Sequence, residues 1–261
     1  MFDSGFGGLT VLRELIARIP GANFVYTGDT ARLPYGAKSR ATVARYATEA
    51  ASFLVDQGAE FLVIACNTAS ALALDEICDA VTVPVLGVVE PGAAEAAAHS
   101  ATRECIVLAT SATVESGAYA KACEKLGVRA LEKACPLLVP LVEESWTDHP
   151  VTRQVAQIYL DDAFHAASGQ GMNPDTIVLG CTHYPLLRPL LAELAPPNTR
   201  IVDSAESVAQ RVAEAFPAAS TGTAGSDCSF FATDSVAKFR TLGERFLGRS
   251  IPSVQLVDLG G

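Results

Sequence analysis

The chain has 261 residues and a formal net charge of −10; hydrophobic residues make up 49% of it and charged residues 18%. This composition excludes a disordered chain, and the acidic balance excludes nucleic acid as the main partner, because phosphate binding needs a basic surface. No apolar run reaches the roughly 18 residues needed to span a membrane, and the opening MFDSGFGG lacks the parts of a signal peptide, so we expect a soluble, cytoplasmic protein without a membrane partner.

Segments typical of strands alternate with segments typical of helices from the start of the chain. Short apolar runs at residues 23–28, 61–66 and 83–89 are typical of strands. Apolar residues at helical spacing predict a helix over residues 41–57, and a second helix is expected over residues 72–77. The alternation predicts βαβ units and a parallel sheet.

The same alternation continues to the end of the chain. Further strands are predicted at residues 105–110, 176–181, 200–204, 230–234 and 254–257. Further helices are predicted at residues 116–126, 151–167, 206–216 and 236–246. The fold class is therefore α/β.

A Pro-Gly pair in VEPG, residues 89–92, interrupts the pattern and predicts a linker between two lobes. We expect the first lobe to be discontinuous, with residues 1–90 joined by residues 205–261. Residues 91–204 then form the second lobe. Both lobes should have mainly parallel sheets.

Two cysteines occupy matching positions. Cys66 and Cys181 each end an apolar run typical of a buried parallel strand, and the polar sequences NT and TH follow them at once. Open α/β sheets bind ligands at the carboxyl ends of their strands, so we expect the two thiols to lie on two lobes that face one another. Such a pair suits a reaction that needs proton transfer at two opposite faces of a substrate.

The residues beside the cysteines are suited to binding a small polar substrate. A helix that begins at a cysteine lowers the pKa of the thiol from its ordinary value of about 8.5, whereas a neutral thiol in that place can donate a proton. Asn67, Thr68 and Thr182 can hydrogen-bond a carboxylate or an amine without adding a charge. The alternative is a core cysteine beside a helix-capping threonine. The repeat of the arrangement favours a functional site.

Three further side chains are candidates for holding or moving a proton. His183 follows Cys181 closely, and its ordinary pKa of about 6.5 is near working pH. Asp3 is the matching candidate at the other thiol, and Glu143 is a third. Asp3 opens DSGFGG, which is either an anion-binding turn before a helix or only a tight turn, and which matches neither a dinucleotide fingerprint nor a P-loop.

Spacing excludes two other thiol chemistries. A phosphatase loop requires an arginine where Leu72 and Leu187 stand. The closely spaced cysteine pairs of structural zinc sites are absent from the sequence, although Cys66, Cys181 and His183 leave a metal site open. The seven cysteines are odd in number and show no paired spacing, which predicts free thiols.

Over nearly its whole length the chain resembles the bacterial glutamate racemases of the aspartate/glutamate racemase family. The matching motifs are DSGFGGLTV (3–11), PYG (34–36), IACNTA (64–69), VEPGA (89–93), VPLVE (139–143), LGCTHYPLL (179–187) and FFAT (230–233). The resemblance implies two flavodoxin-like lobes with the active site in the cleft between them. It also implies a cofactor-independent interconversion of L- and D-glutamate that supplies D-glutamate for peptidoglycan synthesis, and a homodimer.

Residue roles follow from the same resemblance. It makes Cys66 and Cys181 the two acid/base residues, the first acting on the D-isomer and the second on the L-isomer, with Asp3 assisting Cys66 and His183 with Glu143 assisting Cys181. The resemblance implies no metal. It implies substrate contacts from Asp3, Ser4, Tyr35, Gly36, Asn67, Thr68, Thr113, Thr182 and His183.

The chain departs from the family at its start, because family members have a short strand before the aspartate. Only Met1 and Phe2 precede Asp3 here, which predicts a weakened first strand and no activation by a peptidoglycan precursor. Two alternatives stay open: another amino-acid racemase, such as an aspartate racemase, and a catalytically impaired binder of small anions.

Overall fold

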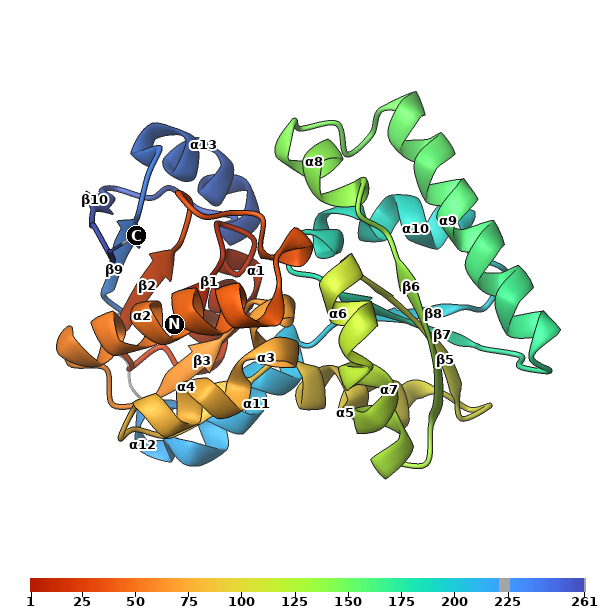
Figure 1. Ribbon diagram of the computed structural model, residues 1–261, viewed down its shortest axis with the longest axis horizontal. Helices are drawn as coiled ribbons and strands as arrows, with labels where there is room; N and C mark the ends of the chain where they lie inside the picture. The colour runs from red at the N-terminus through yellow and green to blue at the C-terminus, as the bar shows by residue number, and fades with distance from the viewer. Residues whose placement is uncertain (221–225, 261) are drawn as a thin grey trace. The chain divides into compact units, whose positions relative to one another are not determined.

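A computed structural model describes residues 1–220 and 226–260 of the chain. The chain divides into two α/β units (Figure 1). Unit 1 consists of Met1–Val88 and Ala205–Gly261, and unit 2 of Val89–Ser204. Within the described residues, no helix is both long and apolar enough to cross a membrane.

Unit 1 is built on a six-stranded sheet in the order β10-β9-β2-β1-β3-β4, and every neighbouring pair is parallel. Its strands are β1 (Phe2–Asp3), β2 (Phe24–Gly28), β3 (Leu62–Ile64), β4 (Val85–Gly87), β9 (Cys228–Ala232) and β10 (Gln255–Leu256). The strands near the centre are buried on both faces, which explains why their sequences are continuous apolar runs rather than alternating ones.

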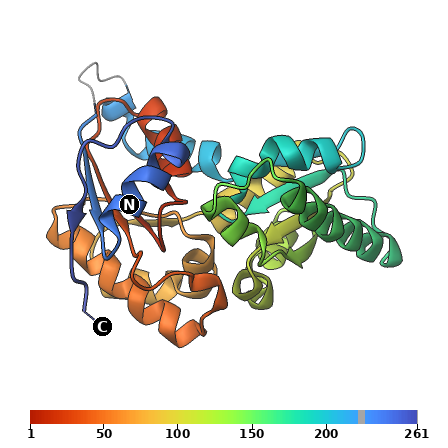
Figure 2. The same ribbon diagram turned by 90° about the horizontal axis from the view of Figure 1, so that it is seen from above.

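The helices of unit 1 cover both faces of its sheet. The elements are α1 (Leu9–Arg18), η1 (Tyr35–Ala37), α2 (Arg40–Asp56), α3 (Asn67–Leu72), α4 (Leu74–Ala80), α11 (Ala205–Ala215), α12 (Pro217–Ser220) and α13 (Val236–Leu247). Helices α1, α11 and α13 pack together on one face, and α2, α3 and α4 on the other (Figure 2). The connection from β1 to β2 and the connection from β2 to β3 run in opposite directions across the sheet. Because both crossovers are right-handed, their helices, α1 and α2, must lie on opposite faces.

The first strand is short but is held on both sides. Phe2 pairs with Thr27 of β2 and with Ile64 of β3, so β1 lies in the interior of the sheet. Beyond its amino end is a cavity of about 510 Å³, lined in part by Met1 and Phe216. Burial lowers the pKa of the Met1 amine to about 5. The carboxyl end of β1, which carries the candidate site residues, is paired with β2 as far as Asp3.

Unit 2 contains a four-stranded parallel sheet in the order β6-β5-β7-β8. Its strands are β5 (Glu104–Ala109), β6 (Arg129–Ala134), β7 (Thr176–Gly180) and β8 (Arg200–Val202). Its helices are α5 (Val89–His99), α6 (Ser111–Ser116), α7 (Ala118–Lys125), α8 (Leu138–Glu143), α9 (Pro150–Gly169), η2 (Tyr184–Leu187) and α10 (Arg188–Leu194). Both sheets contain four strands in the same arrangement, β2-β1-β3-β4 in unit 1 and β6-β5-β7-β8 in unit 2. When the four are numbered along the chain, their order across the sheet is 2-1-3-4, which is the flavodoxin-like order.

Several predicted elements differ from the structure. The boundary between the units falls at the start of VEPG, as predicted, but the segment is helical rather than an irregular linker. It forms the first turn of α5, where Pro91 has no intrahelical bond to lose. Gly92 serves packing there, since a Cβ at this position would lie 2.9 Å from the Tyr119 hydroxyl oxygen. The single helix predicted over residues 116–126 is broken by Gly117, whose φ is +63°, into the end of α6 and α7.

Candidate active site

The candidate residues form two clusters, one in each unit. The Cys66 cluster in unit 1 contains Asp3, Ser4, Cys66, Asn67 and Thr68. The Cys181 cluster in unit 2 contains Thr110, Thr113, Glu143, Cys181, Thr182 and His183. Cys66 lies two residues after β3 and Cys181 directly after β7, at the carboxyl ends of interior strands, which is where parallel α/β sheets bind ligands.

Sheet register brings Asp3 and Cys66 together. Asp3 is the last residue of β1 and Cys66 lies just beyond the neighbouring β3; the two segments are joined where the Ala65 amide donates to the Phe2 carbonyl oxygen at 2.8 Å. The Cys66 thiol is 4% exposed, donates to Ser4 Oγ at 3.5 Å and accepts from the Ala69 amide at 3.4 Å. The carboxylate of Asp3 is fully buried, and the Gly5 amide donates to its Oδ2 at 3.0 Å.

Of the two alternatives for this thiol, a pKa lowered by the helix start or a neutral thiol, the pKa of Cys66 favours the second. Burial, followed by the negative charge of Asp3, raises the pKa of Cys66 to about 11. The Ala69 amide and Ser4 lower it in part, but α3 has only six residues and its free N–H groups do not offset the desolvation. Cys66 is therefore a neutral thiol in this structure and is ready to donate a proton.

The DSGFGG segment is a tight strand-to-helix turn that holds Asp3 in place. A Cβ on Gly8 would lie 2.7 Å from the Asp3 Cβ and 2.9 Å from the Ala65 Cβ, so only glycine fits. The buried Tyr26 hydroxyl donates to the Gly5 carbonyl oxygen at 3.0 Å and fixes the other side of the turn. Tyr26 was not predicted as a site residue, because its role depends on a contact with a distant segment.

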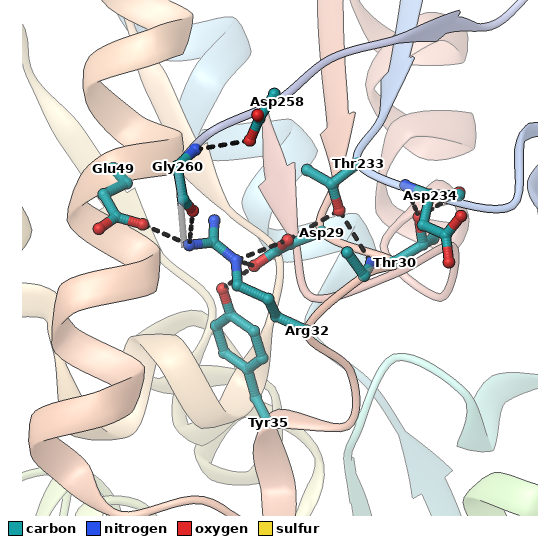
Figure 3. Close-up of polar contacts among 10 residues, drawn as sticks. Asp29, Thr30, Arg32, Tyr35, Glu49, Thr233, Asp234, Asp258 and Gly260 are labelled. Atoms are coloured by element: carbon teal, nitrogen blue, oxygen red, sulfur yellow. Dashed lines mark hydrogen bonds and ion pairs between the residues drawn. The ribbon is translucent and has the colours of Figure 1, made fainter.

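The Tyr35 side chain is buried in the core of unit 1, so its phenol is not placed to contact a substrate. Its ring is buried against Phe2 and Tyr46, and its hydroxyl donates to Asp29 Oδ2 at 2.5 Å (Figure 3). The η1 turn that contains Tyr35 packs against α3, which begins directly after Cys66. Its backbone and that of half-buried Gly36, rather than the phenol, are therefore the groups available for a substrate beside this cluster.

In unit 2, the threonines at the end of β5 lie one strand away from Cys181. Ala109 pairs with Gly180, so the chain leaves β5 and β7 at the same level. The hydroxyl groups of Thr110 and Thr113 are 2.9 Å apart and hydrogen-bonded, and Thr113 is fully buried. Cys181 is 6% exposed.

His183 and Glu143 come from separate elements and meet in the structure. His183 Nε2 lies 3.3 Å from Glu143 Oε1, and both side chains are mostly buried. The carboxylate faces the imidazole and forms an ion pair with it when the ring is protonated. The next residue, Tyr184, fixes the loop by donating to the carbonyl oxygens of Ala109 at 3.3 Å and Cys135 at 2.8 Å. The sequence signal for this tyrosine was its place in CTHYP.

Neither cluster resembles a metal centre. Across the residues that the structure describes, no group of three or more His, Cys, Asp or Glu side chains is arranged to hold a metal ion. All seven cysteines lie within those residues, and each is a free thiol. Each unit therefore has a buried thiol that is followed along the chain by neutral hydroxyl or amide side chains, with Asp3 beside Cys66 and His183 two residues after Cys181.

Comparison with known proteins agrees with this arrangement. Residues 10–212 match the family model described as Asp/Glu/Hydantoin racemase. The chain belongs to this racemase family. A family member from Koribacter versatilis (strain Ellin345), named glutamate racemase, is 55% identical over 285 residues, covering 100% of this chain and 97% of the relative.

Solved structures of the racemase family extend the similarity to the fold. Glutamate racemase isoform RacE1 from Bacillus anthracis has a TM-score of 0.90 and 34% identity, over 99% of this chain and 96% of that one. A glutamate racemase from Francisella tularensis, solved in complex with D-glutamate, has a TM-score of 0.89 and 33% identity with the same coverage. The family, the two parallel sheets and the two strand-end thiols are thus consistent with one another.

Proposed function

We propose that this protein is a glutamate racemase that interconverts L- and D-glutamate by a two-base mechanism, with Cys66 and Cys181 as the bases. The observation that carries the proposal is the duplicated arrangement of a buried thiol at the end of an interior strand, surrounded by neutral hydrogen-bonding groups. Full-length relatives named glutamate racemase support glutamate as the substrate.

Racemisation without a cofactor requires one thiolate and one thiol. The thiolate removes the α-proton from one face of the amino acid, the electron pair stays on the α-carbon, and the opposite thiol returns a proton to the other face. The enzyme is then left with the two protonation states exchanged. Desolvated, preorganised donors stabilise the carbanion, and each proton-transfer group contributes a factor of about 10² to 10⁴ in rate.

Burial and the charge of Asp3 determine the protonation state in which Cys66 begins the reaction. Its raised pKa leaves the thiol protonated, which suits the donor half of the reaction. Binding of the ammonium group of glutamate near Asp3 would neutralise the charge that helps to raise that pKa and would favour the thiolate. Asp3 is therefore proposed to assist Cys66, while Ser4, Asn67 and Thr68 bind polar groups of the substrate.

At the second thiol, the His183–Glu143 pair is proposed to hold or relay the proton of Cys181. The two side chains are within 3.3 Å of each other and are screened from solvent. Thr182 and Thr113 provide hydroxyl groups for the substrate. By resemblance to the family, Cys181 acts on L-glutamate and Cys66 on D-glutamate.

The wider role follows from the same proposal. We infer that the reaction needs neither a metal nor another cofactor, that it takes place in the cytoplasm as part of D-glutamate supply for peptidoglycan synthesis, and that the active form is a homodimer. Aspartate is the alternative substrate, because the same two-thiol chemistry can act on either amino acid.

The test is α-proton exchange in D₂O. Purified protein is incubated with L-glutamate and no added cofactor, while NMR follows loss of the α-proton signal and optical rotation follows inversion. Exchange with inversion is expected, and Cys66→Ser and Cys181→Ser should each abolish inversion. Exchange with aspartate alone would change the substrate, undiminished activity in either variant would refute the two-base mechanism, and no exchange with either amino acid would refute the racemase.

A further inference from the structure

The segment between β2 and α2 holds a polar network that includes Asp29, Arg32 and Tyr35 (Figure 3). It begins with Asp29, whose amide donates to the Asp3 carbonyl oxygen at 3.1 Å, so the network starts one strand away from a candidate site residue. The Asp29 carboxylate is fully buried, and the Arg32 side chain is 10% exposed. A buried carboxylate is retained only when its oxygen atoms are well paired.

The Asp29 carboxylate accepts hydrogen bonds from two side chains of its own loop and from one at the end of β9. It accepts from Arg32 Nε at 3.0 and 2.8 Å, from the Tyr35 hydroxyl at 2.5 Å, and from Thr233 Oγ1 at 2.8 Å. Thr233 directly follows β9 and also accepts from the Ala31 amide at 2.9 Å. The carboxylate therefore joins the loop to the end of a neighbouring strand and to the phenol of Tyr35.

Arg32 extends the network in two further directions. Its Nη1 forms an ion pair with Glu49 of α2 and donates to the Gly260 carbonyl oxygen at 3.1 Å. Its guanidinium also lies 4.2 Å from the centre of the Tyr46 ring, also on α2. One side chain thus connects the loop to a helix and to the C-terminal segment, using the planar donor geometry that lysine lacks.

Outside this network, Thr30 ties the start of the loop to the segment after β9, because its Oγ1 donates to the Asp234 carbonyl oxygen at 2.5 Å and accepts from the Asp234 amide at 2.9 Å. These bonds lie five residues before Tyr35. In residues 30–38, Tyr35 is the one buried residue, and the others are exposed or half-exposed. The Tyr35 ring is held at one end by the Asp29 carboxylate and on its sides by Phe2 and Tyr46. The position of the Tyr35–Gly36 backbone against α3 therefore depends on the Asp29 network.

We propose that Asp29 and Arg32 are positioning residues that fix the Tyr35–Gly36 backbone for glutamate binding, an inference that rests on the proposed racemase function. Neither side chain needs to touch the reacting atoms. Since a displacement of about 1 Å in a positioning group can lower the rate about 10²-fold, loosening this loop should weaken substrate binding without changing the protonation of Cys66.

The experiment compares Arg32→Ala and Arg32→Lys with the control Arg40→Ala, which removes an exposed arginine that pairs with Glu76 on the surface. We expect Arg32→Ala to raise the KM of both isomers about tenfold or more with a smaller fall in kcat and an unchanged pH–rate profile. Lysine should restore part of the loss, and Arg40→Ala should behave as wild type. Because the two enantiomers have equal free energies, kcat/KM must fall equally in both directions.

Amide hydrogen exchange gives a readout that does not depend on turnover. Peptides covering residues 31–38 should exchange faster in Arg32→Ala, while those from unit 2 stay unchanged. Thr233→Val keeps the side-chain shape but removes the bond to Asp29 and the bond from the Ala31 amide. It should show the same effects to a smaller degree, and it serves if the alanine variant fails to fold.

The outcomes separate this inference from the proposed function. A wild-type protein that does not racemise glutamate defeats the proposed function, and calorimetric binding of glutamate to wild type and Arg32→Ala then tests positioning by itself. Unchanged KM in a folded Arg32→Ala variant overturns the inference, as does unchanged exchange in residues 31–38. A shifted pH–rate profile would also overturn it, because Arg32 would then act on proton transfer.

Discussion

The raised pKa of Cys66 predicts how this thiol should react in the ligand-free protein as pH is increased. Burial and the charge of Asp3 move its pKa from 9.0 to about 11. At pH 8 an unshifted thiol of that kind would be about 10% thiolate, whereas Cys66 should be about 0.1% thiolate, a hundredfold difference in the reactive species. The shift corresponds to a free energy of about 3 kcal/mol between the two protonation states.

The assay is alkylation by iodoacetamide, followed for each cysteine by peptide mass spectrometry between about pH 7 and pH 10. The Cys66 rate should rise about tenfold per pH unit across this range without levelling off, since only the thiolate reacts. Limited access to the buried sulfur lowers the rate by the same factor at every pH, so the shape of the profile reports the pKa. Exposed Cys78 supplies an internal reference in the same sample.

A rate that levels off at or below pH 9 would refute the claim that burial keeps Cys66 protonated. Asp3→Asn separates the two causes of the shift. It should move the Cys66 profile to lower pH while leaving its midpoint above the ordinary value, because burial is the larger cause. An unchanged profile in Asp3→Asn would show that the charge of Asp3 does not reach the thiol.

Three further predictions concern stability and the second thiol. Burial raises the pKa of Cys135 to about 12, so the unfolded protein releases this proton at lower pH than the folded protein does. In urea denaturation, the contribution of this thiol to the free energy of unfolding should be fully present below about pH 9 and should fall as the pH rises toward 12. Gly8→Ala should lower the free energy of unfolding by about 1–3 kcal/mol, because the new Cβ would press on the Asp3 Cβ. Thermal denaturation measures this loss, and an unchanged melting temperature would contradict the close approach of the two residues. Glu143→Gln keeps its shape but loses the charge facing His183, and it should lower kcat about tenfold or more and move the pH–rate profile; a wild-type profile would remove Glu143 from the mechanism.

The sequence predicted the interior strands because those strands are apolar on both faces. The runs before Cys66 and Cys181 correspond to β3 and β7, and the alternation with helices predicted two parallel sheets. Strand β6 was missed because it lies at a sheet edge and carries charged residues, including Glu132 and Lys133. The VEPG segment was misassigned because a Pro-Gly pair is compatible with both a linker and a first helical turn.

The sequence by itself determined the α/β class, the two strand-end thiols and the family, because these depend on local patterns of residues. The family resemblance already implied that His183 and Glu143 act together, and the structure shows them 3.3 Å apart. Only the tertiary structure decided that Arg32 joins α2 to the C-terminal segment and that the Tyr35 phenol points into the core. The protonation state of Cys66 belongs to the same group. Each depends on burial and on distances between segments far apart in the chain, which sheet register and helix packing set and local sequence does not.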